Sequence, residues 1–458
     1  MKILKRILWV LIPLLIAAFI FFVNHFGPII SGFGAKGVCS CVYVGNRTAQ
    51  SAIDNELGAF PLSLGTFELN ELEQSATGSV FGFAKAKAIY RKGLGCTLVR
   101  DLSEEEIREQ QGDLALNIPT LSDTLYWPQG TKISDTVPTG IDLEKLISVV
   151  DQSFKNSNPE IPAKTRSVIV VYKGQMIYEA YSADFDQYAA QLGWSMTKSV
   201  TNMLFGVLDQ QGRFDIHKPA PIVEWKGDER AKITTDHLLR MSSGLHWEEV
   251  YSNVSTATNM LYTSANMGDF ALNQKATGKP DSEWYYSSGT TNILSKILRD
   301  ELGASYYQFA QDELFSKLGI TTAVIEPDAG GTHVGSSYMW ASARDWARLG
   351  QLYLNHGNWF GEQIVSPEWV SYTVQPTANA PKGEYGAQWW LNAGESANPA
   401  NRLLKDVPVD MYMMDGYEGQ RVFVIPSSHL VVVRLGQNKK GGFDHNSFLS
   451  SVIDCIEK

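Results

Sequence analysis

Apolar and polar residues recur with clear periods in the last two thirds of the chain. In DLEKLISVVDQSFKN, residues 142–156, the apolar positions predict a helix with one buried face; they are Leu143, Leu146, Ile147, Val150 and Phe154. The segment RSVIVVYKGQMIYEAYS, 166–182, predicts two strands joined in a hairpin at Lys173–Gly174. Segment 421–436 predicts a second pair of strands, joined at 426–428, and 446–458 predicts a closing helix.

Between these strands, the segment 195–375 has mostly helical patterns separated by loops. Strands at both ends and helices between them predict an α+β fold, in which an antiparallel β-sheet is flanked by helices and accompanied by a mostly helical subdomain. We place this domain at 139–458. Ahead of it, 31–138 contains short apolar stretches between turn-forming residues, which predicts a small, partly β subdomain and then a linker.

The first thirty residues have the pattern of a membrane anchor. Ile7–Val23 carries no charge and is close to the length that crosses a bilayer, and it follows three basic residues, Lys2, Lys5 and Arg6. Because positive charges stay on the cytoplasmic side, we expect the rest of the chain on the periplasmic side of the inner membrane. No small-x-small cleavage site follows closely, so we favour a retained single-pass anchor over a signal peptide that is removed.

Three glycines beyond this anchor, Gly32, Gly34 and Gly37, match the G-x-G-x-x-G pattern of dinucleotide-binding loops. That loop works between a strand and a helix of a βαβ unit, whereas this one follows a membrane segment. We therefore interpret the glycines as a flexible juxtamembrane link.

Charge and histidine placement exclude several functions. The 458 residues carry a formal net charge of −10, with no basic run beyond the N-terminus, so nucleic acid is not an expected partner. None of the eight histidines lies in a metal-ligand pattern, and no G-x-S-x-G sequence occurs. These features argue against a zinc hydrolase and an α/β-hydrolase, and we expect no metal and no cofactor.

The four cysteines fit an oxidising compartment better than a metal site, because a Cys-x-Cys pair with distant partners lacks zinc-ligand spacing. A disulfide from Cys39 or Cys41 to Cys96 is the expected arrangement. The alternative, in which these three and Cys455 are all free thiols, stays open because sequence alone does not fix connectivity.

The stretch GWSMTKSV, 193–200, contains the first candidate for chemistry. Residues three apart on a helix share a face, so the Lys198 amine can reach the Ser195 hydroxyl. A serine becomes a nucleophile when a base takes its proton, and a lysine acts as such a base when burial or a nearby cation lowers its pKa. The apolar flanks predict a buried helix that begins near Ser195. The alternative is a helix-capping serine followed by an exposed lysine.

Two further stretches strengthen this candidate. In EWYYSSGTTNIL, 283–294, a tyrosine before an apolar helix is able to relay a proton between Ser195 and a leaving group; the alternative is a pair of aromatic core residues. In MMDGYEGQRVFVIP, 413–426, glycines open a strand where a substrate can approach the backbone. There the N–H of Gln420 would pair with that of Ser195 as an oxyanion hole; the alternative is a bulged edge strand.

Together with ITTDHLLRMSSGLHW, 233–247, and the segment 335–369, these stretches resemble the penicillin-recognising serine hydrolases. More narrowly, they resemble the class C β-lactamase-related branch, which includes 6-aminohexanoate-dimer hydrolases and esterases. The resemblance covers about 140–455. It implies that Ser195 is the nucleophile, Lys198 its base and Tyr286 the tyrosine of the second motif, with Tyr285 as the register alternative.

The chain departs from the resemblance at the positions expected to bind substrate. Ser288 stands where many relatives have Asn, and Tyr417-Glu418-Gly419 stands where they have Lys-Thr-Gly or His-x-Gly. Relatives that bind penicillins use that Lys or His to hold the antibiotic's carboxylate. We therefore expect β-lactams to be poor substrates.

Other polar residues in these segments have structural interpretations. His237 resembles a helix-packing residue, and Asp345 with Arg348 an ion pair or cap. We expect a membrane-anchored serine hydrolase that cleaves an amide or ester of a small molecule or a short peptide-like substrate through an acyl-serine. The alternatives are a D,D-peptidase or β-lactamase, and a binding protein on the same fold that has lost turnover.

Overall fold

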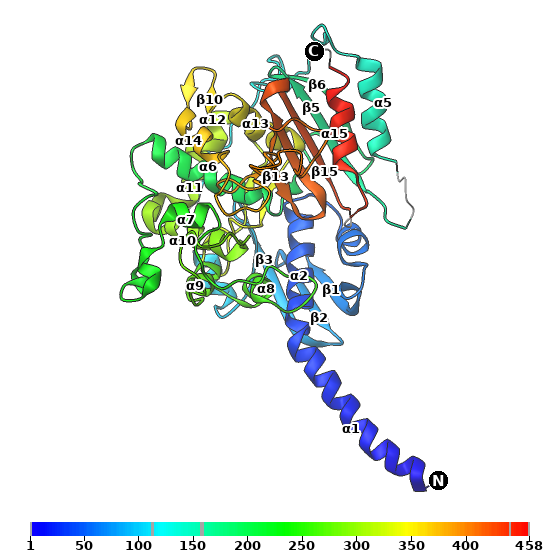
Figure 1. Ribbon diagram of the computed structural model, residues 1–458. Helices are drawn as coiled ribbons and strands as arrows, with labels where there is room; N and C mark the ends of the chain where they lie inside the picture. Colours follow the sequence, from blue (N-terminus) through cyan, green and yellow to red (C-terminus); the bar gives the residue numbers. More distant parts are fainter. Residues whose placement is uncertain (1, 111–113, 156–159, 439–440, 457–458) are drawn as a thin grey trace. The chain divides into compact units, whose positions relative to one another are not determined.

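The computed structural model describes residues 2–110, 114–155, 160–438 and 441–456. Contacts between residues divide the chain into two compact units, and Figure 1 labels many of their elements. The first unit comprises Met1–Asp113, Trp247–Phe270 and Glu326–Thr332, and the second comprises Leu114–His246, Ala271–Ile325 and His333–Lys458.

The first unit contains a long apolar helix, a second helix and a four-stranded antiparallel sheet in the order β1-β2-β3-β4. Its elements are α1 Lys2–His25, α2 Gly27–Tyr43, α3 Ala49–Ala52, η1 Ile53–Leu57, η2 Leu62–Leu64, β1 Gly65–Asn70, β2 Ser75–Val80, β3 Phe83–Arg91, β4 Gly95–Leu98, α4 Glu104–Glu109 and α8 Thr256–Thr263. Helix α9, Met267–Leu272, crosses the boundary into the second unit. Within α1, Arg6–His25 is long and apolar enough to cross a membrane, and almost none of it is buried.

The interpretation of Gly32, Gly34 and Gly37 as a flexible link is wrong, because all three lie inside α2. A Cβ atom on Gly34 would lie within 2.4 Å of three atoms of the Phe67 ring on β1. The glycine therefore lets the helix pack closely on the sheet. Such a packing role depends on a residue far along the chain, which the local pattern does not contain.

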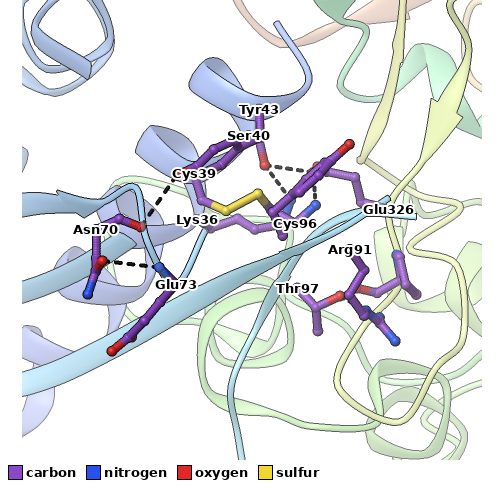
Figure 2. The surroundings of a disulfide bond; sticks show 12 residues. Lys36, Cys39, Ser40, Tyr43, Asn70, Glu73, Arg91, Cys96, Thr97 and Glu326 are labelled. Atoms are coloured by element: carbon purple, nitrogen blue, oxygen red, sulfur yellow. Dashed lines mark hydrogen bonds and ion pairs between the residues drawn. A yellow bond between two sulfur atoms is a disulfide. The ribbon is translucent and has the colours of Figure 1, made fainter. Parts of the chain in front are cut away.

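A disulfide joins Cys39 on α2 to Cys96 on β4, which selects Cys39 over Cys41 as the partner of Cys96. Figure 2 shows the polar groups beside it. The buried carboxylate of Glu326 accepts hydrogen bonds from the Cys96 backbone N–H and the Ser40 hydroxyl, both at 2.7 Å. It also forms an ion pair with Lys36 of α2. These contacts link α2, β4 and the distant segment 326–332 within the first unit.

The second unit contains a six-stranded antiparallel sheet in the order β12-β13-β14-β15-β5-β6, with helices packed on it. Its strands are β5 Thr165–Tyr172, β6 Gln175–Tyr181, β7 Gln191–Leu192, β8 Val324–Ile325, β9 Met339–Ala341, β10 Asn358–Trp359, β11 Glu362–Gln363, β12 Trp390–Leu391, β13 Tyr412–Gly416, β14 Gln420–Ile425 and β15 Leu430–Gly436. Its helices and helical turns are α5 Leu143–Ser153, α6 Met196–Gln210, η3 Val223–Trp225, η4 Glu229–Lys232, α7 Thr235–Leu239, α10 Ser288–Leu302, η5 Gly303–Ser305, α11 Tyr306–Ala310, η6 Gln311–Phe315, α12 Ser316–Leu318, α13 Ala343–Leu354, α14 Pro367–Thr373, η7 Tyr417–Gly419, η8 Pro426–Ser428 and α15 His445–Ile453.

Helices cover the six-stranded sheet of this unit. Helices α5 and α15 share a buried apolar cluster with its strands, to which Val150, Val432 and Leu449 belong. Helix α13 lies against β14, β15 and β5 (Figure 1). This antiparallel sheet flanked by helices confirms the predicted α+β fold, because both terminal strand pairs join one sheet.

The locally patterned elements form where the sequence predicts them. Asp142 caps α5, since its carboxylate accepts the Lys145 backbone N–H at 3.0 Å. Lys173 and Gly174 form the turn between β5 and β6 with φ angles of 49° and 79°. The closing helix, predicted over 446–458, is shorter in the structure: α15 spans His445–Ile453.

Candidate active site

Ser195 and Lys198 lie at the start of α6, in the second unit. The Lys198 Nζ atom donates hydrogen bonds to Ser195 Oγ at 3.2 Å, to Ser288 Oγ at 2.9 Å and to the Ser336 carbonyl at 2.8 Å. Lys198 is 1% exposed, whereas Ser195 is half-buried. Ser195 occupies the N-cap position, but its side chain accepts no capping hydrogen bond. The alternative of a capping serine and an exposed lysine is therefore wrong.

The segment before Ser195 has an unusual backbone. Trp194 has a φ of 48°, in the left-handed region that bulky residues seldom adopt. Backbone strain of this kind is common at functional sites, where the surrounding structure holds it in place. The neighbouring Gly193 is fixed by its N–H, which donates to the Met339 carbonyl at 2.9 Å. Together these features fix the backbone between β7 and α6.

Tyr286 lies beside the lysine. Its ring centroid is 5.0 Å from Lys198 Nζ, and its ring packs against Trp390 and Tyr385 at centroid distances of 5.4 and 5.7 Å. The neighbouring Tyr285 is 48% exposed. Of the two tyrosines considered from the sequence, Tyr286 is thus the one that contacts Lys198.

The residue pair that follows Tyr286 opens helix α10. Ser287 caps this helix, because its Oγ accepts the Thr290 N–H at 3.0 Å. The cap places Ser288 at the first helical position, where its hydroxyl accepts the hydrogen bond from Lys198. Ser288 is fully buried. It is therefore a partner of the lysine in this structure.

The third motif, Tyr417–Gly419, forms a tight turn between β13 and β14. Just before it, a Cβ atom on Gly416 would lie 2.1 Å from the Gly193 carbonyl oxygen, so glycine is required for this close approach. The Tyr417 ring meets the Trp194 ring edge-on at 5.7 Å. The motif therefore lies next to the residue that precedes Ser195.

The charges of this motif differ from a lysine or histidine site. Burial and the nearby Glu418 carboxylate raise the pKa of Tyr417, so that its phenol is neutral at neutral pH. Arg421 is held at 2.6 Å from Asp415. Arg434 donates to the Gly419 carbonyl at 3.2 Å, and burial lowers its pKa to about 9. The motif thus presents a neutral phenol and an acidic residue.

Gln420 follows the motif and is buried. Its Oε1 atom accepts the Gly436 N–H at 3.0 Å, and its Nε2 atom donates to the Tyr417 carbonyl at 3.3 Å. The side chain therefore fixes the backbone of the turn. Its backbone N–H as an oxyanion donor stays a prediction.

Sequence reasoning missed two residues that build the site. The Ser336 carbonyl accepts from Lys198, although segment 335–369 entered the prediction only as part of a resemblance. Gln388 joins three elements: its Oε1 accepts from Thr291 of α10 at 2.8 Å, its carbonyl from Ser199 of α6 at 2.8 Å, and its Nε2 donates to Leu239 of α7 at 2.9 Å. No local pattern marks either residue, because each contact joins segments far apart in sequence.

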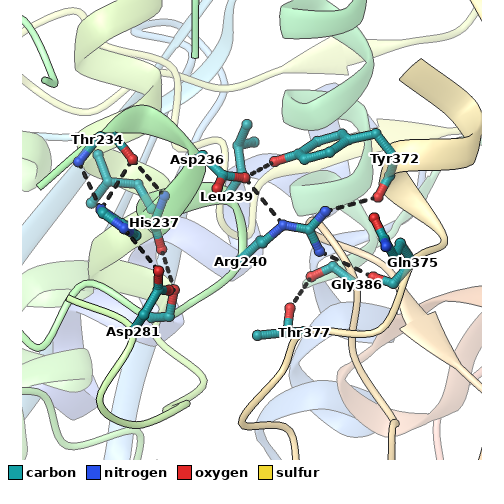
Figure 3. A network of polar contacts seen from close by, with 12 residues as sticks. Thr234, Asp236, His237, Leu239, Arg240, Asp281, Tyr372, Gln375, Thr377 and Gly386 are labelled. Atoms are coloured by element: carbon teal, nitrogen blue, oxygen red, sulfur yellow. Dashed lines mark hydrogen bonds and ion pairs between the residues drawn. The ribbon is translucent and has the colours of Figure 1, made fainter. Parts of the chain in front are cut away.

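His237 lies in a separate polar network, shown in Figure 3. Its Nδ1 atom accepts the Thr234 backbone N–H at 3.0 Å, and its Nε2 atom lies 3.1 Å from Asp281. Close by, Asp236 contacts Arg240 at 3.1 Å and accepts from the Tyr372 hydroxyl. Burial, together with this carboxylate, raises the pKa of Tyr372. These contacts are structural, in line with the interpretation of His237 from the sequence.

The predicted ion pair of Asp345 and Arg348 is confirmed, with both side chains buried and 2.8 Å apart. Among the described residues, no group of three or more His, Cys, Asp or Glu side chains is arranged to hold a metal ion.

Comparisons with known proteins place this geometry in context. Residues 163–447 match the family model named Beta-lactamase. A 6-aminohexanoate-dimer hydrolase from Paenarthrobacter ureafaciens is 25% identical over 296 residues, which cover 59% of this chain and 72% of that protein.

Two solved structures share the fold at low sequence identity. A Bacillus anthracis protein described as a candidate 6-aminohexanoate-dimer hydrolase aligns with a TM-score of 0.54 at 21% identity, over 71% of this chain and 84% of its own. A family VIII carboxylesterase aligns with a TM-score of 0.51 at 12% identity, over 71% of this chain and all of its own. Each of them supports the fold alone.

Proposed function

We propose, from the premise that this chain belongs to the beta-lactamase family, that it hydrolyses an amide or ester bond through an acyl-serine intermediate on Ser195. The family makes it a serine hydrolase. One observation carries the assignment of the nucleophile: the buried Lys198 amine lies 3.2 Å from the Ser195 hydroxyl oxygen. A nucleophile and a base within hydrogen-bond reach are the minimal requirement of such chemistry.

The buried lysine is suited to the role of base. It donates to two serine hydroxyls and a backbone carbonyl, which are neutral groups. Burial disfavours the charged form of a lysine side chain, which supports its proposed role as the acceptor of the Ser195 proton. Tyr286, against which the amine packs, is the proposed relay to the leaving group.

The proposed reaction has two steps. Ser195 Oγ attacks the carbonyl carbon, its proton passes to the Lys198–Tyr286 pair, and this pair returns a proton to the departing amine or alkoxide. Water then attacks the acyl-serine ester, gives up a proton to the same pair and releases the acid, while Ser195 Oγ regains its proton.

The backbone N–H groups of Ser195 and Gln420 are the proposed oxyanion donors. The tight approach of Gly416 to the Gly193 carbonyl supports this role, because Gly416 is the register partner of Gln420. Both donors would then come from fixed backbone, which needs no rearrangement as negative charge develops on the substrate oxygen.

The proposed substrate is a small molecule or a short peptide-like compound, neutral or cationic near the third motif. Tyr417, Glu418 and Gly419 are its proposed contacts, whereas Ser288, which is fully buried and accepts from Lys198, is proposed to act through the lysine. Arg421, the nearest basic residue in sequence, faces Asp415 at 2.6 Å. Glu418 would therefore repel an anionic group at this turn, and Arg421 would attract it little because Arg421 is already paired with Asp415.

We also propose that α1 anchors the chain in the inner membrane, with the catalytic unit on the periplasmic side. The length and apolar composition of Arg6–His25 support the anchor, and the basic residues ahead of the apolar run support the direction. The disulfide between Cys39 and Cys96 supports an oxidising compartment.

Labelling with a fluorophosphonate tests the nucleophile. The purified full chain should form one adduct that peptide mapping places on Ser195, and Lys198→Met should slow labelling strongly. An adduct elsewhere, or none, would refute the assignment. Hydrolysis of short esters, amides and D-alanyl peptides by the same preparation then ranks the substrates, and a preference for D-alanyl peptides would favour the D,D-peptidase alternative.

A further inference from the structure

The hairpin that joins β2 to β3 in the first unit carries two exposed aromatic residues at its tip. Phe81 is 51% exposed and Phe83 is 58% exposed. Val80 and Phe83 are register partners, so Phe81 and Gly82 form a two-residue turn. Single exposed apolar residues are common on protein surfaces, so exposure alone carries no function.

The backbone of the turn makes Phe81 unusual. Phe81 and Gly82 have φ angles of 52° and 79°, which define the type of turn that favours Asn-Gly or Gly-Gly. A bulky aromatic residue in the left-handed region is disfavoured by its own Cβ. The tip therefore carries a large apolar side chain where folding alone would favour a small polar residue.

The tip also contacts the membrane-length helix. Phe19 of α1 lies with its ring centroid 5.7 Å from that of Phe81 and 6.2 Å from that of Phe83. Phe19 lies inside the apolar span Arg6–His25, six residues before its end. Six helical residues rise about 9 Å, so the tip of the hairpin lies beside a point on α1 that is about 9 Å before the end of the apolar span at His25.

The hairpin is held in this place by packing at the junction of α1 and α2. A Cβ atom on Gly27 would lie 2.6 Å from the Ala84 Cβ atom, which leaves no room between helix and strand. The exposed Lys85 follows Phe83 by two residues on β3, beyond a β-bulge that separates the register pairs Val80–Phe83 and Gly78–Ala86. With the tip in lipid, an ammonium at this height would lie near the phosphate layer of the bilayer, just above the two aromatic rings.

We propose that Phe81 and Phe83 insert into the bilayer beside α1 and give the first unit a second contact with the membrane. This inference rests on the proposed anchoring by α1. The span Arg6–His25 is about 30 Å long, the thickness of the hydrocarbon core. A tip beside Phe19 is then within the bilayer, at a depth of about 5–10 Å that is usual for interfacial aromatic groups. Two contacts fix the height and rotation of the unit, which one helix does not.

Spin labels on the full chain in lipid nanodiscs test this depth. In a background with Cys41→Ala and Cys455→Ala, single labels are placed through Phe83→Cys, Leu72→Cys and Ile16→Cys. Leu72 is the matched control, because it is 99% exposed in the turn between β1 and β2, at the opposite end of the same sheet. Ile16 reports on α1 itself.

Accessibility to oxygen, which enters lipid, is compared with accessibility to a nickel chelate, which stays in water. The labels at 16 and 83 should favour oxygen, and the label at 72 should favour nickel. If 16 favours oxygen while 83 behaves like 72, the inference is overturned and the anchor stands. If 16 favours nickel, the proposed anchoring itself fails.

A second variant removes the rings without breaking the turn. Phe81→Asn introduces the residue that this turn prefers, and it is combined with Phe83→Ser. A label at Lys85→Cys should then become several-fold more accessible to the nickel chelate than in the chain with both phenylalanines. An unchanged ratio would overturn the inference, because the rings would then have no part in placing the hairpin.

Discussion

Each unit of the protein has a buried lysine that contacts a serine three or four residues away in sequence. The two lysine–serine pairs differ in the other groups that contact the lysine. In the first unit, Lys36 Nζ donates to Ser40 Oγ at 2.9 Å and pairs with the Glu326 carboxylate (Figure 2). In the second unit, Lys198 Nζ contacts Ser195 Oγ, a second hydroxyl and a carbonyl. Both lysines are buried, at 6% and 1% exposure.

The carboxylate changes what the first pair can do. Burial lowers the pKa of Lys36, but Glu326 opposes this effect by charge and hydrogen bonding. The Ser40 proton points to the same carboxylate, which lies 2.7 Å from Ser40 Oγ. The first pair is therefore a closed structural network, whereas the serine of the second pair is half-buried. We therefore expect the reactivity of a lysine and a serine on one helix face to depend on the groups that surround them.

Removing each serine should give the largest contrast. Ser195→Ala should lower kcat/KM on the preferred substrate by about 10⁴-fold or more, because no acyl-serine forms. Ser40→Ala should leave it within about twofold, since Glu326 keeps its bonds to Cys96 and Lys36. Steady-state kinetics on folded protein measure both. Near wild-type turnover by Ser195→Ala would remove the proposed nucleophile.

Removing each lysine should separate activity from stability. Lys198→Met should reduce kcat by about 10³-fold, the scale of a lost general base. Lys36→Met should leave the activity of the folded enzyme unchanged but destabilise it by about 3–5 kcal/mol, because Glu326 is left as an uncompensated buried charge. Denaturant unfolding and kinetics of both variants check this contrast.

A double variant provides the control for Lys36. Lys36→Met combined with Glu326→Gln removes the stranded charge and should recover part of the lost stability. No recovery would mean that packing, rather than charge, is what Lys36 contributes.

The disulfide should matter for the first unit only. It closes a loop with a sequence separation of 57 residues, for which the chain-entropy model gives about 4 kcal/mol. Cys39→Ala with Cys96→Ala should therefore lower the unfolding free energy by about 2–4 kcal/mol and spare turnover. Cys41→Ala, at a neighbouring buried cysteine, should cost about 1 kcal/mol or less and serves as the control in thermal unfolding.

Much of the second unit could be predicted because its signals are local. The face of α5, the β5–β6 hairpin and the Ser195–Lys198 spacing each involve residues within a few positions of one another. The α+β fold followed from the order of these elements along the chain. Resemblance to a family supplied the choice of Tyr286, which local pattern alone left open.

The remaining features depend on long-range contacts that no window of sequence contains. Ser336 is 138 positions from Lys198, and Glu326 is 290 positions from Lys36. Gly34 of α2 is an example, because its close packing is set by Phe67 on the later strand β1. A lysine and a serine spaced along a helix occur in both units, so spacing predicts proximity but not reactivity.

The two tyrosines of the second motif give a test with a smaller expected effect, because Tyr286 contacts Lys198 whereas Tyr285 is exposed. Tyr286→Phe keeps the ring against Lys198 and Trp390 but removes the hydroxyl, and it should lower kcat by about 10²-fold. Tyr285→Phe, at an exposed neighbour, should change kcat by less than about threefold. Finding the reverse order in steady-state assays would move the motif by one residue.

The smallest expected effect concerns the charge of the third motif. Glu418 lies in the turn with a φ of 62°, and burial together with its carboxylate raises the pKa of the adjacent Tyr417. An anionic cephalosporin should therefore be a poorer substrate than a neutral p-nitrophenyl ester. A higher kcat/KM for the cephalosporin would instead favour the β-lactamase alternative.

Glu418→Gln isolates that charge, because the amide keeps the shape of the side chain. One unit charge a few ångströms away in water is worth up to about 1 kcal/mol, so kcat/KM for the cephalosporin should rise by about two- to fivefold while the ester stays within about 1.5-fold. The gain should shrink at high salt, since screening acts on a charge and not on a change of shape. Glu301→Gln is the control: it removes an exposed charge at the other end of α10, about 20 Å along the helix from Ser288, and should change neither substrate. An equal gain from both variants would mean that net charge of the protein, rather than the third motif, sets the preference.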